Sequence, residues 1–236
     1  MNNRYLTASQ IAARRKFIQQ NYFHDKTNAM LYLRYRILRP LLKSYTKLLM
    51  LPWYNEPTPW LTPAAVEILD ELITREMTGF EFGSGKSTLF LAARSRQLVS
   101  VEHDAAWFKV VRNELSKRNF TNVQYHLILP DPNQTYTLPQ NSYDDYVLPA
   151  GNNEAFIQYY SSIRNYPDEH FDYILVDGRA RTNCVMEAIP KLKPDGFLIL
   201  DNAERVRYRH VHELLHGWKK IFTTTGLTDT VFWFKP

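Results

Sequence analysis

Residues 78–88 read TGFEFGSGKST, and this stretch decides the predicted fold. The run TGFEF at 78–82 predicts a strand, and Gly83 and Gly85 predict a tight turn into a helix. Glycine lets a backbone approach a ligand closely, and the unpaired N–H groups at a helix N-terminus face the same side. The turn between this strand and this helix is therefore the first candidate binding loop.

Short strands and helices alternate around this turn. Thr62-Pro63 predicts the start of an amphipathic helix over 63–76, because threonine caps helices and proline fits their first turn. Hydrophobic periodicity predicts further strands at 97–102, 123–129, 173–177 and 196–202, and helices at 87–93, 105–118, 184–192 and 208–219. The last residues predict two strands around Gly226 that form a hairpin. This order predicts an α/β fold with a doubly wound, mostly parallel sheet and an antiparallel C-terminal edge.

Composition supports a folded chain without a membrane-spanning segment. The 236 residues are 44% hydrophobic and 22% charged, which is typical of a globular protein. The single cysteine, Cys184, excludes a disulfide framework and a four-cysteine zinc site. No apolar run approaches the roughly 20 residues that cross a bilayer, and the N-terminus lacks an apolar signal core. We expect a cytoplasmic protein.

The first 50 residues differ in charge from the rest. They hold ten basic side chains and one acidic one, whereas the whole chain has a net charge of +5. We expect a basic helical N-terminal extension over 1–52, followed by the main domain over 53–236. The extension is either an arm for an anionic partner, such as nucleic acid, a phosphorylated glycan or a membrane surface, or a helical cap with a solvated basic face. The first alternative leaves peripheral membrane contact open.

Two known nucleotide-binding patterns fit the loop incompletely. A P-loop requires G-x-x-x-x-G-K-[ST]; Gly85-Lys86-Ser87 fits its end, but its first glycine would fall on Phe80. That alternative predicts a nucleotide-binding phosphotransferase or NTPase. A nicotinamide-binding fold requires G-x-G-x-x-G, and here Thr88 stands at the third glycine.

A third pattern fits the loop better. Glu81, Gly83, Gly85 and Ser87 lie two residues apart and resemble the E/D-x-G-x-G-x-G first motif of class I S-adenosylmethionine (SAM)-dependent methyltransferases, with Ser87 in place of the last glycine. The resemblance covers roughly residues 60–236. It implies a Rossmann-like, seven-stranded sheet of strand order 3-2-1-4-5-7-6, and SAM as the cofactor.

The end of the second strand strengthens this resemblance. Seventeen residues after Gly85 that strand ends in Glu102, where a carboxylate can accept hydrogen bonds from both ribose hydroxyls of an adenosyl cofactor. His103 follows and could line the adenine side. The implied cofactor contacts are therefore Glu81, Gly83, Ser84, Gly85, Ser87, Thr88, Glu102 and His103.

Polar side chains also follow two later strands. Asp177 ends the strand YILVD, and Asp201-Asn202 end GFLILDN; ligands of open α/β sheets bind beyond such carboxyl ends. Asp177, Asp201 and Asn202 resemble the magnesium triad of catechol-type O-methyltransferases. This implies Mg²⁺ or another divalent cation that would hold an acceptor hydroxyl. The lysine base of that family is replaced here by Ala180.

Without a metal ion, Asp177 is a candidate general base or a partner for the sulfonium end of the cofactor; acids that merely cap adjacent helices are the structural alternative. Arg179 and Arg181 stay protonated, so they are poor bases, but they could clamp a carboxylate or phosphate of the acceptor. The candidate catalytic residues are Asp177, Asp201, Asn202, Arg179 and Arg181.

The predicted reaction is methyl transfer from SAM to a hydroxyl oxygen of a small molecule or glycan, with nucleic acid as a less favoured acceptor. A Tyr-rich insertion at about 131–170 is expected to wall the acceptor site. A non-catalytic scaffold that binds membrane or nucleic acid through its basic arm stays an alternative. The sequence leaves the oligomeric state open.

One further motif is expected to be structural. Residues 212–216 read HELLH and match the H-E-x-x-H pattern of zinc proteases. The extended form of that pattern requires a glycine where Lys219 stands, and no third ligand is evident downstream. We expect a surface helix there.

Overall fold

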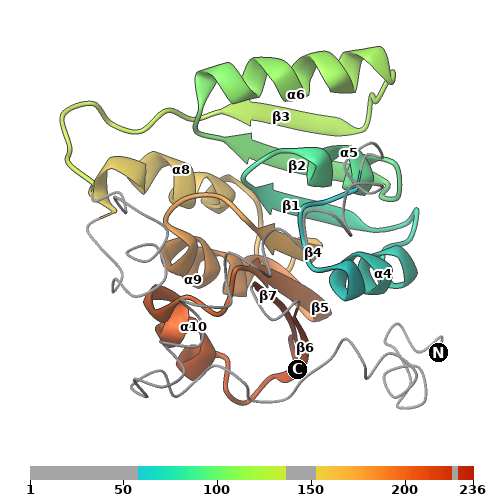
Figure 1. Ribbon diagram of the computed structural model, residues 1–236, viewed down its shortest axis with the longest axis vertical. Helices are drawn as coiled ribbons and strands as arrows, with labels where there is room; N and C mark the ends of the chain where they lie inside the picture. The colour runs from blue at the N-terminus through green and yellow to red at the C-terminus, as the bar shows by residue number, and fades with distance from the viewer. Residues whose placement is uncertain (1–57, 137–152, 225–227) are drawn as a thin grey trace, which may run out of the picture.

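Seven strands form one sheet in the order β3-β2-β1-β4-β5-β7-β6 in the computed structural model of the chain (Figure 1). The structure describes residues 58–136, 153–224 and 228–236. The extension predicted over 1–52, the insertion residues 137–152 and the turn at 225–227 lie outside the described residues. The strands are β1 (Thr78–Phe82), β2 (Gln97–Glu102), β3 (Val123–Leu127), β4 (Phe171–Val176), β5 (Leu192–Asp201), β6 (Lys219–Thr224) and β7 (Asp229–Phe234).

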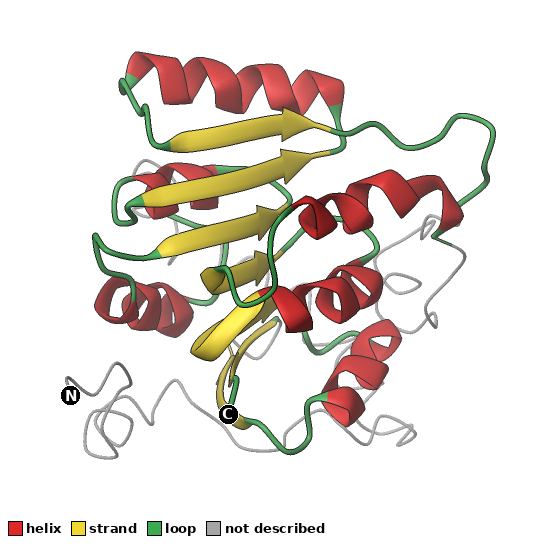
Figure 2. Cartoon of the chain, turned by 180° about the vertical axis from the view of Figure 1, so that it is seen from behind, coloured by secondary structure: helices red, strands yellow, loops and turns green. Residues whose placement is uncertain are grey.

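Strands β1 to β5 are parallel, and the last two strands form the antiparallel edge. Phe80 at the centre of β1 pairs with Val99 of β2 on one side and with Ile174 of β4 on the other. Strand β7 runs antiparallel to both β5 and β6. The predicted doubly wound sheet and its antiparallel C-terminal strands are thereby confirmed. The parallel strands point toward the same edge (Figure 2), and the strand order reverses beside β1, where such sheets bind ligands.

Helices cover both faces of this sheet (Figure 1). Helices α4, α5 and α6 pack on one face, and α8, α9 and α10 pack on the other. The short 3-10 helices η2 (Glu154–Phe156), η3 (Ser162–Asn165) and η4 (Val206–Tyr208) adjoin the second group. Within the described residues the α-helices are α4 (Pro63–Leu72), α5 (Lys86–Ala92), α6 (Ala105–Lys117), α8 (Ile157–Ser161), α9 (Arg181–Lys191) and α10 (Arg209–Leu214).

Strand β4 is apolar from Tyr173 to Val176 because it contributes to two cores. In β4, Tyr173 and Leu175 join the core beneath α4, α5 and α6, whereas Ile174 and Val176 join the core beneath α8, α9 and α10. All four side chains are fully buried. A strand buried on both faces cannot show the polar-apolar alternation of a half-exposed strand.

Three predicted helix boundaries were wrong. The helix predicted over 63–76 ends at Leu72, because Ile73 adopts an extended conformation (φ −80°, ψ 128°) and the chain turns toward β1. The helix predicted over 208–219 ends at Leu214, and β6 already begins at Lys219. Helix α9 starts at Arg181 instead of at residue 184, because Ala180 takes a left-handed conformation (φ +48°) that turns the chain just after β4.

The H-E-x-x-H segment has a structural role, as expected. His212 Nε2 lies 3.1 Å from the carbonyl oxygen of Ala203, and His216 Nδ1 lies 3.0 Å from that of Glu213. Helix α10 ends before His216, so the two histidines do not share a helical face. Each ring instead bonds a backbone carbonyl.

Gly79 provides a stability test of the packing at the sheet centre. A Cβ atom at residue 79 would lie 2.0 Å from Tyr173 Cζ, and this ring is held by a 2.6 Å contact between Tyr173 Oη and Ser95 Oγ. We expect Gly79→Ala to lower the free energy of unfolding by about 1–3 kcal/mol, as overpacking does. Urea denaturation measures it.

Gly217→Ala is the matched control, because no atom lies within 4 Å of the Cβ that it adds. Equal stability of the two variants would contradict the packing of Tyr173 on Gly79.

Candidate cofactor and acceptor site

The turn after β1 touches the turn after β4 through backbone atoms. Gly83 has a φ of +89°, and a Cβ atom there would lie 2.5 Å from Gly178 Cα. Its N–H donates to the carbonyl of Val101 at 2.9 Å, which ties the same turn to β2. Only glycine combines this conformation with this close approach. The ends of three neighbouring strands thus meet at Gly83.

Glu81 supports the glycine turn from inside the fold. Its Oε2 accepts hydrogen bonds from Thr88 Oγ1 and Ser100 Oγ, both at 2.6 Å. Thr88 Oγ1 in turn accepts the Gly85 N–H at 2.9 Å, so the fully buried Thr88 connects the turn to Glu81. Ser87 is buried in the same first turn of α5. Glu81 Oε1 is buried and has no hydrogen-bond partner among the described residues.

Burial raises the pKa of Glu81 to about 7, although the hydrogen bonds from Ser100, Ser87 and Thr88 act in the opposite direction. The carboxyl group lies wholly inside the protein, where the charged form loses its hydration. Near neutral pH the group therefore exists in both protonation states.

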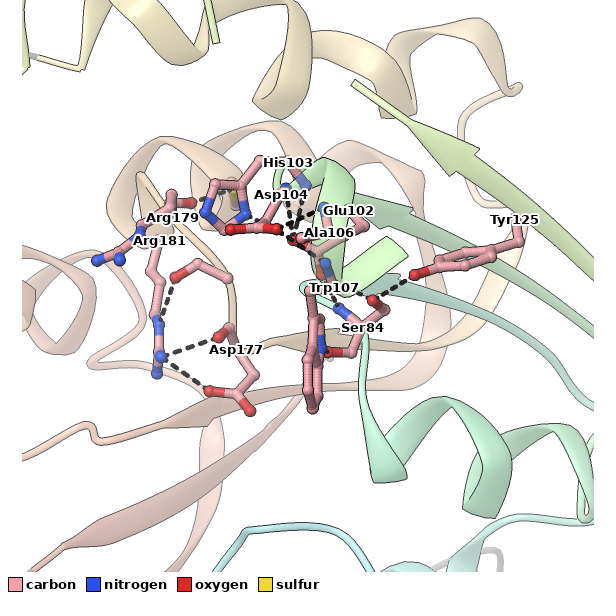
Figure 3. A network of polar contacts seen from close by, with 12 residues as sticks. Ser84, Glu102, His103, Asp104, Ala106, Trp107, Tyr125, Asp177, Arg179 and Arg181 are labelled. Carbon is pink, nitrogen blue, oxygen red and sulfur yellow. Dashed lines mark hydrogen bonds and ion pairs between the residues drawn. The ribbon is translucent and has the colours of Figure 1, made fainter. Parts of the chain in front are cut away.

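Glu102 lies against the glycine turn and is enclosed by donors (Figure 3). Its Oε2 accepts the Ser84 N–H at 3.0 Å and the Ser84 hydroxyl at 2.7 Å. Its Oε1 accepts the backbone N–H groups of His103 and Asp104 at 2.8 and 2.9 Å. Burial alone would raise the pKa of Glu102, but the hydrogen bonds from His103, Ser84 and Asp104 together lower it to about 2. The carboxylate stays charged and oriented at any physiological pH.

Two aromatic side chains that the sequence analysis did not single out border this turn. Trp107 Nε1 donates to the Ser84 carbonyl oxygen at 2.8 Å, and Tyr125 Oη lies 2.6 Å from Ser84 Oγ (Figure 3). Trp107 stands in the first turn of α6, whose N-cap, Asp104, accepts its backbone N–H. The sequence could have indicated Trp107, because it lies only five residues after Glu102. Tyr125 could not be found from local sequence, because β3 is brought beside β2 only by the fold.

The His103 ring faces a wall of aromatic side chains. Its Nδ1 lies 2.8 Å from Glu102 Oε1, and its ring meets Phe156 and Tyr159 edge-to-face at 5.7 and 5.9 Å between centroids. The Tyr159 hydroxyl is buried without a hydrogen-bond partner among the described residues, and a Cβ on Gly178 would lie 2.0 Å from it. Tyr159 therefore fills the space that glycine leaves at 178.

Asp177 and Asp201 lie at the carboxyl ends of adjacent strands, as the sequence suggested. Asp177 follows β4 directly and its side chain is 26% exposed, whereas Asp201 ends β5 and its side chain is 4% exposed. Burial and the nearby Asp177 charge raise the pKa of Asp201 well above its usual range. Asn202 has a φ of +52°, and its Nδ2 donates to Thr228 Oγ1 at 2.7 Å.

The two arginines after β4 differ in environment. Arg179 is exposed, and in Figure 3 its side chain points away from Asp177. Arg181 is buried at 7% exposure, and its Nη2 lies 2.8 Å from Asp177 Oδ1. Its guanidinium also bonds the carbonyl oxygens of Asp177, Gly178 and Asp201. Arg181 thus binds its own chain, and Arg179 is the arginine that can reach an acceptor.

The described residues contain neither a membrane-spanning helix nor a cluster of metal-ligating side chains. No helix there has the length and apolarity that a bilayer crossing requires. No three His, Cys, Asp or Glu side chains in the same part of the chain are grouped so that they could hold a metal ion. The roles of the candidate site residues stay predictions; the structure shows only where each side chain lies.

A side chain is excluded at Gly83 but has space at Gly85, so alanine substitutions at the two positions give a matched test of the turn. We expect Gly83→Ala to destabilise the protein by more than about 1 kcal/mol, because the positive φ and the backbone of Gly178 both oppose a side chain. Gly85→Ala should change stability by less than about 0.5 kcal/mol, because its φ of 171° is extended and no atom lies closer than 4.0 Å. Chemical denaturation of both variants measures this; a Gly83→Ala protein as stable as wild type would contradict the contact with Gly178.

Glu81 predicts a pH dependence of stability. Because its folded pKa of about 7 exceeds the ordinary 4.5, the folded state binds the proton more tightly and loses stability as pH rises from about 4.5 to 7. We expect the stability of Glu81→Gln relative to wild type to increase by about 2 kcal/mol between pH 5 and pH 8. Urea denaturation of the ligand-free proteins at both pH values tests this, and a difference independent of pH would contradict the raised pKa.

Solved structures with a similar fold are methyltransferases or methyltransferase-like proteins. No protein-family model matches the sequence, and no curated protein matches it. A provisionally assigned caffeoyl-CoA O-methyltransferase from Staphylococcus aureus aligns with 90% of this chain and 95% of its own, at a TM-score of 0.53 and 16% identity. A methyltransferase-like protein from Silicibacter pomeroyi aligns at a TM-score of 0.53 and 20% identity, over 77% of this chain and 90% of its own.

A provisionally assigned methyltransferase from Streptococcus mutans, determined in complex with SAH, aligns at a TM-score of 0.50 and 12% identity, over 71% of this chain and 93% of its own. At these identities the likeness concerns the fold. Together with the strand order 3-2-1-4-5-7-6, it shows that the chain has the fold of the class I SAM-dependent methyltransferases.

Proposed function

We propose that this protein is a SAM-dependent methyltransferase. The observation that carries the proposal is the joining of the glycine turn to the acid at the end of β2: the Ser84 N–H donates to Glu102 Oε2 at 3.0 Å. A glycine turn that opens a helix, beside a strand-end carboxylate, is an arrangement that binds an adenosyl cofactor. The Streptococcus mutans protein of the same fold binds SAH, which supports this choice of cofactor.

Each part of the site has a role toward SAM. The turn at 83–85 would lie against the methionine part, and the buried Glu81 would hold that turn in place through Thr88. Glu102 would hold the ribose and His103 would border the adenine. Bound SAM would supply a methyl group already activated on a sulfonium, so the protein has chiefly to orient the acceptor and exclude water.

Ribose binding at Glu102 requires one hydrogen bond to be exchanged. The Ser84 hydroxyl now donates to Glu102 Oε2, but Tyr125 Oη is also 2.6 Å from Ser84 Oγ. If the Ser84 hydroxyl donates to Tyr125 instead, a lone pair on Oε2 becomes available to a ribose hydroxyl. Tyr125 Oη then accepts from Ser84, so the Tyr125 O–H, which now donates to Ser84 Oγ, must turn to another acceptor.

A hydroxyl oxygen of a small molecule or glycan is the acceptor that we favour. The exposed part of Asp177 lies at the rim of the sheet next to the glycine turn, where it would take the proton of an acceptor hydroxyl or bind the amino group of the cofactor. The exposed Arg179 would bind an anionic group of the acceptor. The Staphylococcus aureus protein is assigned to O-methylation, which agrees with oxygen as the acceptor atom.

The P-loop alternative is not favoured by the geometry of the turn. Only residues 83–85 separate β1 from α5, and Phe80, which stands at the required first glycine, is fully buried inside β1. A turn of this length cannot wrap around a row of phosphates. The scaffold alternative depends on residues 1–52, which lie outside the described residues.

Calorimetry with SAM, SAH and Mg-ATP on the full-length protein tests the proposal. We expect SAM and SAH to bind and Mg-ATP not to bind. Glu102→Ala should weaken SAH binding by about 10- to 100-fold, because it removes charge-assisted hydrogen bonds to the ribose. Glu114→Ala, which removes an acid of α6 that pairs with Lys117, and Lys86→Ala should leave the SAH affinity nearly unchanged. Binding of Mg-ATP without SAM or SAH would overturn the proposal.

A further inference from the structure

The guanidinium of Arg181 lies between the side chains of Asp177 and Asp201 at the rim of the sheet. The Arg181 side chain is 8% exposed, and its Nη2 lies 2.8 Å from Asp177 Oδ1 and 2.9 Å from the Asp177 carbonyl oxygen. Its Nη1 bonds the Asp201 carbonyl oxygen and lies 4.0 Å from Asp201 Oδ2. Its Nε donates to the carbonyl oxygen of Gly178 at 2.9 Å. Two carboxylates and three carbonyl oxygens thus surround one guanidinium, which is the type of oxygen set that a hard metal cation would take.

The helix itself does not favour an arginine at residue 181, so the contacts with Asp177 and Asp201 are what stabilise it there. It is the first residue of α9, where the positive end of the helix dipole disfavours a cation. The left-handed Ala180 turns the chain so that Arg181 faces back toward Asp177. Its guanidinium also lies 5.7 Å from the centre of the Tyr208 ring, which limits its movement on the other side. Figure 3 shows the side chain extended along the Asp177 carboxylate.

The predicted ligands do not fit a divalent cation in this arrangement. Asp201 Oδ1 accepts a hydrogen bond from Thr230 at 2.8 Å, and this side chain is only 4% exposed, whereas Mg²⁺ usually retains several water molecules. A metal ion at Asp177 would also lie within a few ångströms of the Arg181 guanidinium and be repelled by it.

We propose that Arg181 is a built-in replacement for the divalent cation of this rim: it holds Asp177 in place, and the site works without a metal ion. Arg181 is thus a positioning residue, which fixes one oxygen of Asp177 and leaves the exposed side of that carboxylate toward the acceptor and cofactor. The inference deepens the proposed function, but its test does not require SAM to bind.

Titration with Mn²⁺ in the absence of SAM, followed by electron paramagnetic resonance of the free ion, tests the inference on the full-length protein. Wild type should show no saturable Mn²⁺ site that depends on Asp177. Arg181→Met removes the charge at similar side-chain length, and should bind Mn²⁺ at least roughly tenfold more tightly than wild type because the carboxylates lose their cation. Arg181→Met combined with Asp177→Asn should lose that site again, and Arg181→Lys should not gain it.

A wild-type protein that binds one Mn²⁺ and loses it in Asp177→Asn would overturn the inference, as would a folded Arg181→Met variant that gains no Mn²⁺ affinity. If Arg181→Met does not fold, the Mn²⁺ titrations of wild type and Asp177→Asn still test whether wild type has a metal site at Asp177. SAH calorimetry with and without EDTA separates the two proposals: absence of SAH binding contradicts the proposed function alone, whereas SAH binding that EDTA abolishes contradicts metal independence alone.

Discussion

The backbone contact between Gly83 and Gly178 is the constraint on which the whole site depends. The Asp177 N–H donates to the Phe82 carbonyl at 2.8 Å, and the Gly83 N–H donates to Val101 at 2.9 Å, so sheet hydrogen bonding continues past the strand ends. A side chain at 83 or 178 would force the turns apart. Because the turns stay in contact, the glycine turn, Glu102 and Asp177 belong to one site.

The acids around this contact differ because their surroundings supply different numbers of donors. Glu81 is fully buried and receives hydroxyl hydrogen bonds on one oxygen only, so desolvation dominates and its pKa rises to about 7. Glu102 receives hydrogen bonds on both oxygens, most of them from backbone N–H groups, and its pKa falls to about 2. One acid can therefore change its charge near neutral pH, while the other stays a fixed anion for a ligand to bind.

Much of the fold could be predicted because the strands bury both faces. The runs TGFEF and YILV are apolar at every position that meets a core, and the glycine pattern identifies the turn that opens α5. Helix ends were predicted less well. Helix α10 is shorter than its apolar spacing suggests, because Trp218 and Lys219 belong to the turn and edge strand that follow. Local periodicity does not show where a chain leaves a helix to join a sheet.

Runs of apolar residues and the glycine spacing identified the residues at the ends of β1, β2, β4 and β5 from the sequence, whereas the strand order was only implied by the family resemblance. Only the tertiary structure decided what those residues contact. Tyr125 reaches Ser84 across 41 positions, and Arg181 reaches Asp201 across 20, because parallel strands bring their carboxyl ends together whatever their separation in the chain. The same carboxylates that resemble a metal triad in the sequence are thereby paired with an arginine, because the turn at Ala180 directs its side chain back over the rim.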